Sequence, residues 1–238
     1  MSVSYFRFWV CLGLSAFLMT QGVFAAPIRL ETFPSQSVQP KVLIQGGQFF
    51  ASRCMQCHGL KYFTHDPIGK AAGVVPSKMP NMDPTSWSGH PPPDLSLIAH
   101  YRGVDWLYTY LYSFYQDPSR PTGANNLLAH RSAMPNPFLD LQGMRQLVIH
   151  PKQLLAFNQL NSAQRPPWYR VVKRVQSGQL SDAEFSQKIQ ALVMFLDYVA
   201  EPHRAERYAL GVWVLGFLAV FFIIAWRLKK AYWKDIQS

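Results

Sequence analysis

The five residues Cys54-Met55-Gln56-Cys57-His58 constrain this chain more than any other stretch, because they match the C-x-x-C-H signature of covalent haem attachment. Two thiols three positions apart can add to the two vinyl groups of one porphyrin and form thioether bonds. The histidine that follows then falls under the iron and can be its proximal ligand. The pattern therefore predicts a c-type haem held by Cys54, Cys57 and His58.

Two other chemistries use a C-x-x-C pair, namely a redox-active dithiol and a zinc site. A thioredoxin-like dithiol does not require the histidine, and it would want a βαβ context that the sequence does not indicate. A structural zinc site needs about four ligands, whereas the chain has three cysteines, of which Cys11 lies near the N-terminus. We therefore favour haem and keep the dithiol and zinc as alternatives.

Residues 1–25 have the three-part form of a secretory signal peptide. Arg7 gives a positive start, residues 8–19 form an apolar core, and small residues precede a predicted cleavage after Ala25. An uncleaved membrane anchor is the alternative, because residues 8–26 carry no charge. Either reading exports residues 26–207, which suits the motif since c-type haem is attached outside the cytoplasm.

A second apolar stretch, residues 208–226, predicts one transmembrane helix near the C-terminus. It carries no charge, and as a helix it would cover about 28 Å, close to the thickness of a bilayer core. The alternative is a buried core helix. Basic residues dominate residues 227–238, so the positive-inside rule predicts a cytoplasmic tail. The formal net charge is +10; we expect the lipid bilayer as a partner, and nucleic acid is excluded by the exported compartment.

Local patterns predict helices over residues 41–52 and 104–115, and a third that begins at the capping box Ser181-x-x-Glu184. In the first, Gly46 and Gly47 suit close approach to another helix. Asp94 is expected to cap a further helix. Residues 63–90 and 117–131 are predicted loops, and residues 139–165 receive no element. The third helix carries an apolar stripe that consists of Phe185, Ile189, Leu192, Leu196 and Val199.

The sixth iron ligand decides whether such a haem carries electrons or stays open to small molecules. A methionine thioether fills the position and raises the potential. Met134 is the favoured candidate, because the prolines at 135 and 137 stiffen its loop, and Met144 is second. Met194 is interpreted as core. The remaining candidates of the mature chain are less suitable: Met55, Met79 and Met82.

Several ordered segments together resemble the cytochrome c1 family, the haem c subunits of quinol–cytochrome c oxidoreductases. The resemblance covers most of the chain from about residue 28 and is closest to bacterial members. Two departures are the net positive charge, which leaves the charge of the docking partner open, and a poor match over residues 139–165. The segments that carry the resemblance are QGGQFFASRCMQCHGLKY (45–62), PPDLS (92–96), RGVDW (102–106), TGANN (122–126), AMP (133–135), LQG (141–143), AEP (200–202) and the terminal apolar stretch.

The resemblance implies one covalent haem c per chain, bound by Cys54 and Cys57, with His58 and Met134 as axial ligands and Arg102 near a haem propionate. It implies an all-α, class I-like cytochrome c domain with long loops and one C-terminal transmembrane helix. The implied function is transfer of one electron from a Rieske iron–sulfur centre to another c-type cytochrome. Cytochrome b and Rieske subunits would be its partners in the bacterial inner membrane, with the haem domain in the periplasm. Alternatives are a haem subunit of a terminal oxidase, a standalone membrane-bound shuttle, and a haem catalyst or gas sensor with an open site.

Overall fold

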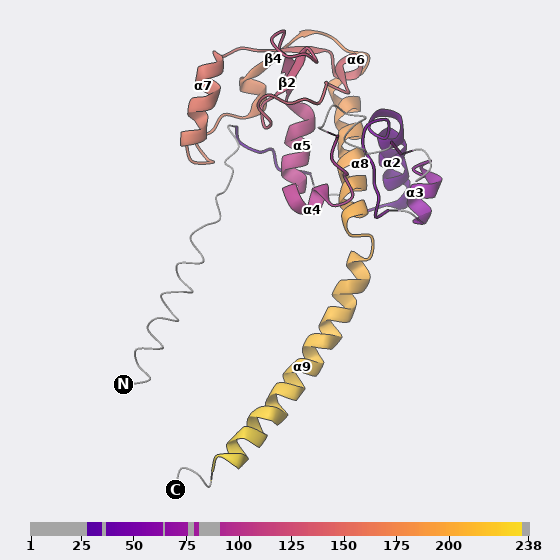
Figure 1. The fold of residues 1–238 in the computed structure, drawn as a ribbon, viewed down its shortest axis with the longest axis vertical. Helices are drawn as coiled ribbons and strands as arrows, with labels where there is room; N and C mark the ends of the chain where they lie inside the picture. Colours follow the sequence, from indigo (N-terminus) through magenta and orange to yellow (C-terminus); the bar gives the residue numbers. More distant parts are fainter. Residues whose placement is uncertain (1–27, 35–36, 64, 76–78, 81–90, 235–238) are drawn as a thin grey trace. The chain divides into compact units, whose positions relative to one another are not determined.

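The computed structural model describes residues 28–34, 37–63, 65–75, 79–80 and 91–234 (Figure 1). The predicted signal peptide, Cys11 and Met82 lie outside these residues. Most of the regular structure described is helical, as predicted, although four short strands depart from a strictly all-α chain. The helices are α2 (Pro40–Arg53), α3 (Pro67–Ala71), α4 (Ile98–Arg102), α5 (Val104–Tyr112), α6 (Leu139–Gln142), α7 (Pro151–Ala156), α8 (Asp182–Ala200) and α9 (Arg204–Tyr232), with 3-10 turns η3 (Phe157–Gln159) and η4 (Trp168–Arg170).

The chain divides into two compact units, one built from residues 34–107 and 186–238 and the other from residues 1–33 and 108–185. We call them the motif unit, because it contains residues 54–58, and the hairpin unit, because it contains all four described strands. Helices α5 and α8 each contribute residues to both units.

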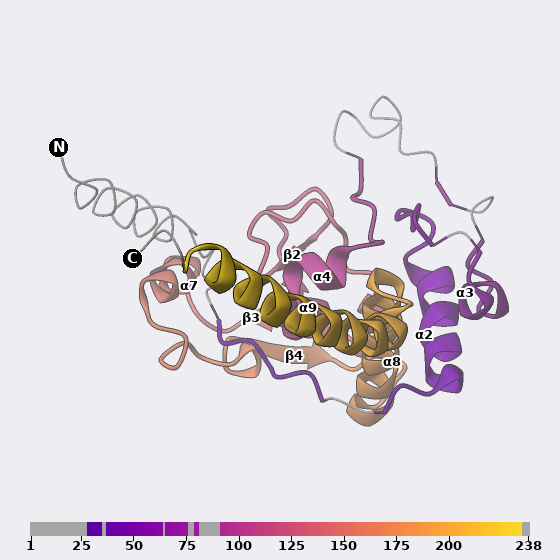
Figure 2. The same cartoon turned by 90° about the horizontal axis from the view of Figure 1, so that it is seen from below.

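In the motif unit, α2 packs against α8 through its two glycines (Figure 2). A Cβ atom on Gly46 would lie 2.0 Å from the backbone oxygen of Ala191, and one on Gly47 would lie 2.6 Å from Cβ of Ala72. Only glycine allows the helices to approach so closely, so the predicted use of this pair is confirmed. Helix α2 begins with a proline in its first turn, a position that a helix tolerates because that amide is not hydrogen-bonded.

Helix α8 begins at the predicted capping box. The Glu184 amide donates to the Ser181 hydroxyl at 3.3 Å, and the Ser181 amide donates to the Glu184 carboxylate at 2.9 Å, which satisfies two otherwise free amides of the first turn. Every residue of the predicted apolar stripe is buried. The helix ends at Ala200, two residues before Pro202, which lacks the amide hydrogen that would continue the helical hydrogen bonds.

The hairpin unit contains two antiparallel pairs of strands, β1 (Phe114–Gln116) with β2 (Ala124–Asn126) and β3 (Met144–Leu147) with β4 (Val172–Gln176). Phe114 pairs with Asn126, and Leu147 pairs with Val172. Part of the core of the hairpin unit is a cluster of buried apolar side chains. Its members come from both segments of the unit: Ile28, Tyr115, Leu127, Leu154, Val171 and Val172.

Four predictions of local structure are corrected. The loop expected over residues 117–131 contains β2. The helix expected over residues 104–115 ends at Tyr112, because the chain from Phe114 onward pairs with β2 instead. The loop expected over 63–90 contains α3, which Asp66 caps by accepting from the amides of Ile68 and Gly69 at 2.7 and 3.1 Å. Residues 139–165, left without an element, contain α6, β3, α7 and η3.

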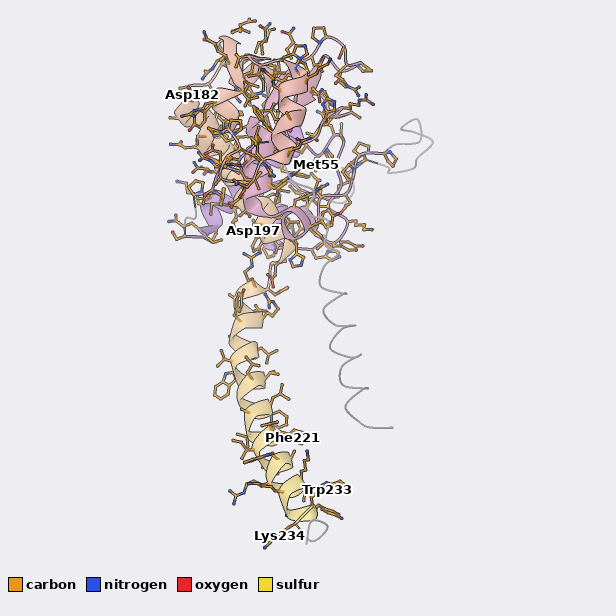
Figure 3. The ribbon with its side chains drawn as sticks, turned by 90° about the vertical axis from the view of Figure 1, so that its left-hand side faces the viewer. Met55, Asp182, Asp197, Phe221, Trp233 and Lys234 are labelled. Atoms are coloured by element: carbon orange, nitrogen blue, oxygen red, sulfur yellow. The ribbon has the colours of Figure 1, made fainter. Side chains whose placement is uncertain are left out.

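Helix α9 includes the whole of the predicted span, residues 208–226. Within the described part of the chain it is the one helix long and apolar enough to cross a membrane, and its most apolar 18-residue window is entirely unburied. Figure 3 shows Phe221 on the apolar part and Trp233 and Lys234 at the end of the helix. An aromatic and basic terminus of this kind is typical of a membrane–water interface.

Candidate haem site

Residues 54–58 form a tight turn that continues α2. The amides of Cys57 and His58 donate to the carbonyl of Cys54 at 3.0 and 2.8 Å, and the Cys54 amide still donates to Phe50 within the helical pattern. In such a turn, residues three apart lie on the same side. The fold therefore presents both thiols from one turn, immediately before the histidine.

Both cysteines are free thiols with different surroundings, since Cys54 is buried and Cys57 is exposed. Burial, and secondly the neighbouring Cys57, raise the pKa of Cys54 to about 12. Within the described residues no group of three or more histidine, cysteine, aspartate or glutamate side chains could hold a metal ion. The zinc alternative therefore has no ligand cluster in that part of the chain.

His58 is buried, with 7% of its surface exposed, and its orientation is fixed by a backbone contact. The ring atom Nδ1 lies 2.8 Å from the carbonyl oxygen of Pro93. Because a carbonyl only accepts, Nδ1 must carry the proton, which leaves the lone pair on Nε2 for a metal. Burial lowers the pKa of His58, against smaller opposing effects of Pro93 and Asp94, so the neutral, ligating form of the ring is favoured.

The segment 92–96 holds the chain that follows His58. The Asp94 carboxylate accepts from the Lys61 amide at 2.9 Å, and the Leu95 amide donates to the Gly59 carbonyl at 2.9 Å. The Ser96 hydroxyl, almost completely buried, accepts from the Tyr62 amide at 3.2 Å. Together with the Pro93 contact, these bonds fix the histidine from a segment far along the chain.

The expected role of Asp94 as a helix cap is therefore corrected in part. The Asp94 carboxylate does accept from the Ser96 amide at 2.9 Å, but α4 begins only at Ile98. The other oxygen of this carboxylate accepts from the Lys61 amide.

Sequence reasoning missed Pro93 as a site residue. The signal available was the rigid run of three prolines before Asp94, but nothing local indicates which carbonyl the histidine will contact.

Met134 belongs to the hairpin unit, whereas the C-x-x-C-H turn belongs to the motif unit. Its side chain is half-buried, and its sulfur accepts a hydrogen bond from the hydroxyl of Tyr110 at 3.4 Å. The Met134 amide donates to the Ser132 hydroxyl at 3.1 Å. Burial raises the pKa of the Tyr110 phenol, with a smaller opposing effect of Ser132.

The other described methionines have identifiable environments. Met194 is buried in α8, as predicted for a core residue, and Met55 is buried within the turn itself. The sulfur of Met79 accepts from the Leu60 amide at 3.2 Å. Met144, the second-choice ligand, lies at the start of β3, where it lines a cavity of about 420 Å³ with residues of the 139–143 and 176–179 segments.

Arg102, the predicted neighbour of a haem propionate, is the last residue of α4 and belongs to the motif unit. Its side chain is exposed, and the guanidinium lies 5.1 Å from the ring centre of Tyr101 and 4.9 Å from that of Trp106. Stacking on aromatic faces orders an arginine without using its hydrogen-bond donors. The donors therefore remain suitable for an anionic group.

The chemistry of these donors fits a haem. Two free thiols on one turn match the two vinyl groups, a neutral imidazole with a defined tautomer suits iron, and a thioether sulfur has two lone pairs. A C-x-x-C-H turn of this kind in a mostly helical chain with an apolar terminal helix is typical of membrane-anchored c-type haem proteins.

Comparison with known proteins identifies the family. The model of the Cytochrome C1 family matches residues 69–236, a range that begins after the C-x-x-C-H turn. Cytochrome c1 of Allochromatium vinosum is 35% identical over 214 residues, which cover 82% of this chain and 84% of that protein. The ammonia monooxygenase gamma subunit of Nitrosomonas europaea is 33% identical over 228 residues (88% and 90%), and cytochrome c1 of Rhodospirillum rubrum is 26% identical over 241 (84% and 83%).

The chain belongs to the cytochrome c1 family. Membership makes it a haem c electron-transfer subunit, which fits the donor set described above. The apolar helix α9 and the relatives together support a membrane-anchored protein.

Proposed function

We propose that this chain carries one electron at a time from a Rieske iron–sulfur centre to another c-type cytochrome, as a subunit of a quinol–cytochrome c oxidoreductase in a respiratory chain. The observation that carries the proposal is the buried His58, which directly follows the second of two free thiols in the chain. Its ring is fixed by the carbonyl of Pro93. Such a histidine is a prepared metal ligand. Family membership then favours this oxidoreductase over other places for a membrane-bound haem c.

In this proposal one haem is held by four side chains. Cys54 and Cys57 form the thioether bonds, Nε2 of His58 is the proximal ligand, and the sulfur of Met134 is the distal ligand. The bound haem supplies a one-electron redox couple, and a methionine ligand favours its reduced state. Arg102 is the proposed partner of a propionate. The domain is proposed to be a class I-like cytochrome c fold.

The proposed partners are cytochrome b and the Rieske subunit in the bacterial inner membrane, with the haem domain on the periplasmic side. Residues 1–25 would direct export and be removed. Residues 208–226 would span the bilayer, and the basic residues after Trp226 would hold the tail in the cytoplasm. The exported domain would then occupy residues 26–207 and the tail residues 227–238.

Covalent attachment can be tested on a denaturing gel stained for haem. The wild-type band should keep its haem after denaturation, whereas Cys54→Ala with Cys57→Ala should lose it while the protein band persists. Met194→Leu is a matched control, because this buried methionine is assigned to the core. A wild-type band without covalent haem would contradict the assignment.

The distal ligand can be tested by redox titration. Met134→Leu should lower the haem potential and open the iron to carbon monoxide in the reduced protein, because leucine cannot coordinate. Met79→Leu and Met144→Leu should keep the wild-type potential and exclude carbon monoxide. An unchanged potential in Met134→Leu would refute the ligand, and carbon monoxide binding to the native reduced protein would favour the open-site catalyst or gas sensor.

A second candidate function is transfer of electrons to a different membrane oxidase or monooxygenase. The relative named as a gamma subunit of ammonia monooxygenase supports it, being almost as similar to this chain as the cytochrome c1 of Allochromatium vinosum. The same class contains the terminal-oxidase subunit and the standalone shuttle. Purification of the tagged chain with its partners separates these cases, because a b-type haem and a Rieske subunit should accompany it only in the first proposal.

A further inference from the structure

We propose that Tyr110 is a positioning residue that raises the haem potential by donating a hydrogen bond to the sulfur of Met134. This inference rests on the proposed function, in which Met134 is the distal ligand. The observation is the contact itself, a phenolic oxygen 3.4 Å from a thioether sulfur. A neutral phenol is a donor at neutral pH, and a thioether sulfur can only accept.

The phenol is held from the helix that carries it. The Tyr110 carbonyl, at the end of α5, accepts from the side-chain amide of Asn126 at 2.9 Å and from the Ser113 hydroxyl at 3.2 Å. The ring packs edge-on against Phe114, with 5.2 Å between ring centres. Asn126 and Ser113 are fully buried and bonded to each other at 3.0 Å. The buried polar network therefore fixes the backbone at Tyr110, and the contact with Phe114 orients its ring.

The loop that carries Met134 is held by its own hydrogen bonds. The Ser132 hydroxyl accepts from the Met134 amide at 3.1 Å, and the Ser132 amide donates to the side chain of Asn125 at 3.4 Å. Asn125 is 1% exposed and donates to Asp117 at 2.9 Å. The segment Ala124–Asn126 thus positions both partners, Asn126 holding Tyr110 and Asn125 holding the methionine loop.

A thioether sulfur has two lone pairs, so it can bind iron with one and accept the phenol with the other. The hydrogen bond withdraws electron density from the sulfur, which weakens its donation to the iron. With iron bound to this sulfur, a weaker donor would disfavour the additional positive charge of the ferric state and so raise the potential, since hydrogen bonding to the axial ligands is one of the factors that set it.

The test is a redox titration of the haem in the intact membrane complex, comparing Tyr110→Phe with the wild type. We expect the reduced-to-oxidised equilibrium constant to fall about three- to tenfold, which corresponds to a potential lowered by about 30 to 60 mV for one electron. Tyr108→Phe removes the same hydroxyl from the same helix, where the ring packs against Phe33 and Tyr112. This control should keep the wild-type potential.

A spectroscopic measurement separates failure of this inference from failure of the ligand assignment. The weak near-infrared band of methionine-ligated ferric haem should persist in Tyr110→Phe and disappear in Met134→Leu. A wild-type potential in Tyr110→Phe, with the band lost in Met134→Leu, would overturn the role of Tyr110 while the ligand stands. Retention of the band in Met134→Leu would overturn both.

A second variant keeps the inference testable if Tyr110→Phe does not accumulate. Incorporation of 3-fluorotyrosine at position 110 preserves the shape of the ring but makes the phenol more acidic and a stronger donor. The inference predicts a potential above that of the wild type. An unchanged or lower potential in this variant would contradict it.

Discussion

Substitution of Gly46 by alanine tests whether the close contact of α2 with α8 supports the C-x-x-C-H turn. The new Cβ would lie 2.0 Å from the backbone oxygen and 2.6 Å from the backbone carbon of Ala191, and 2.8 Å from Cβ of Phe195. Real Cβ atoms stay about 3.0 Å or more from such atoms. Because the obstacle is mainly backbone, the helices must separate by about 1 Å rather than adjust a side chain.

The magnitude follows from two opposing terms. Overpacking a core costs about 1–3 kcal/mol, and a backbone obstacle places this site near the upper end. Alanine recovers about 1 kcal/mol because it is a better helix former than glycine. The net loss of about 2 kcal/mol in the free energy of unfolding lowers the melting temperature by about 4–8 °C in a domain of this size.

The assay is thermal unfolding of the detergent-solubilised protein, followed by far-ultraviolet circular dichroism. Gly47→Ala is the matched variant, because its new Cβ would stay 2.6 Å from the nearest atom, Cβ of Ala72, and 3.0 Å from the Phe195 ring, and should cost less. Gly211→Ala in α9, with no atom within 4 Å, should cause no fall. A melting temperature of Gly46→Ala equal to or above the wild type would refute the reasoning.

Three further changes test other contacts. Tyr198→Phe removes a bond of 2.7 Å to Asp66 and should cost about 1 kcal/mol. Burial, and secondly Asp66, raise the pKa of Tyr198 to about 12. The contribution of the neutral phenol to stability is therefore complete below pH 10 and is lost as the pH rises through 12. The denaturant midpoints of wild type and variant, measured from pH 7 to 11, should converge only above pH 10. Arg145→Lys removes a buried guanidinium that lies over three aromatic rings, and should lower the unfolding free energy by about 1 kcal/mol, so an unchanged midpoint would argue against stacking. Hydrogen bonds from Arg207 and Arg204 of α9 lower the pKa of Glu201 to about 2, so this carboxylate stays ionised above that pH and can hold the start of α9 to the end of α8. Glu201→Gln should broaden the distance distribution between spin labels on the two helices. Identical distributions in variant and wild type would exclude this role of Glu201 in holding the two helices together.

Elements that are defined by local sequence were predictable. The start of α8 depends on a capping box only four residues long, and its buried face on a regular apolar stripe. The span of α9 is evident from an uncharged stretch of sufficient length. The turn at residues 54–58 needs only its own five residues, so its position at the end of α2 follows directly.

Elements that depend on distant partners were not predictable. The aromatic run after Tyr112 has the composition of either a helix or a strand, and its pairing with residues 124–126 decides for β1. The elements within 139–165 are three to six residues long, too short to show a period. The partner of His58 is a backbone carbonyl 35 residues away, and Tyr110 lies 24 residues from Met134. No residue type marks either contact.

The measurement that tests the central claim most directly is quinol-driven reduction of the haem in the purified complex, with and without the iron–sulfur subunit. The account predicts that added quinol reduces the haem within a single turnover. It also predicts that this reduction disappears when the iron–sulfur subunit is removed and returns when that subunit is restored. Reduction at the same rate without the iron–sulfur subunit, or none in the complete complex, would contradict it.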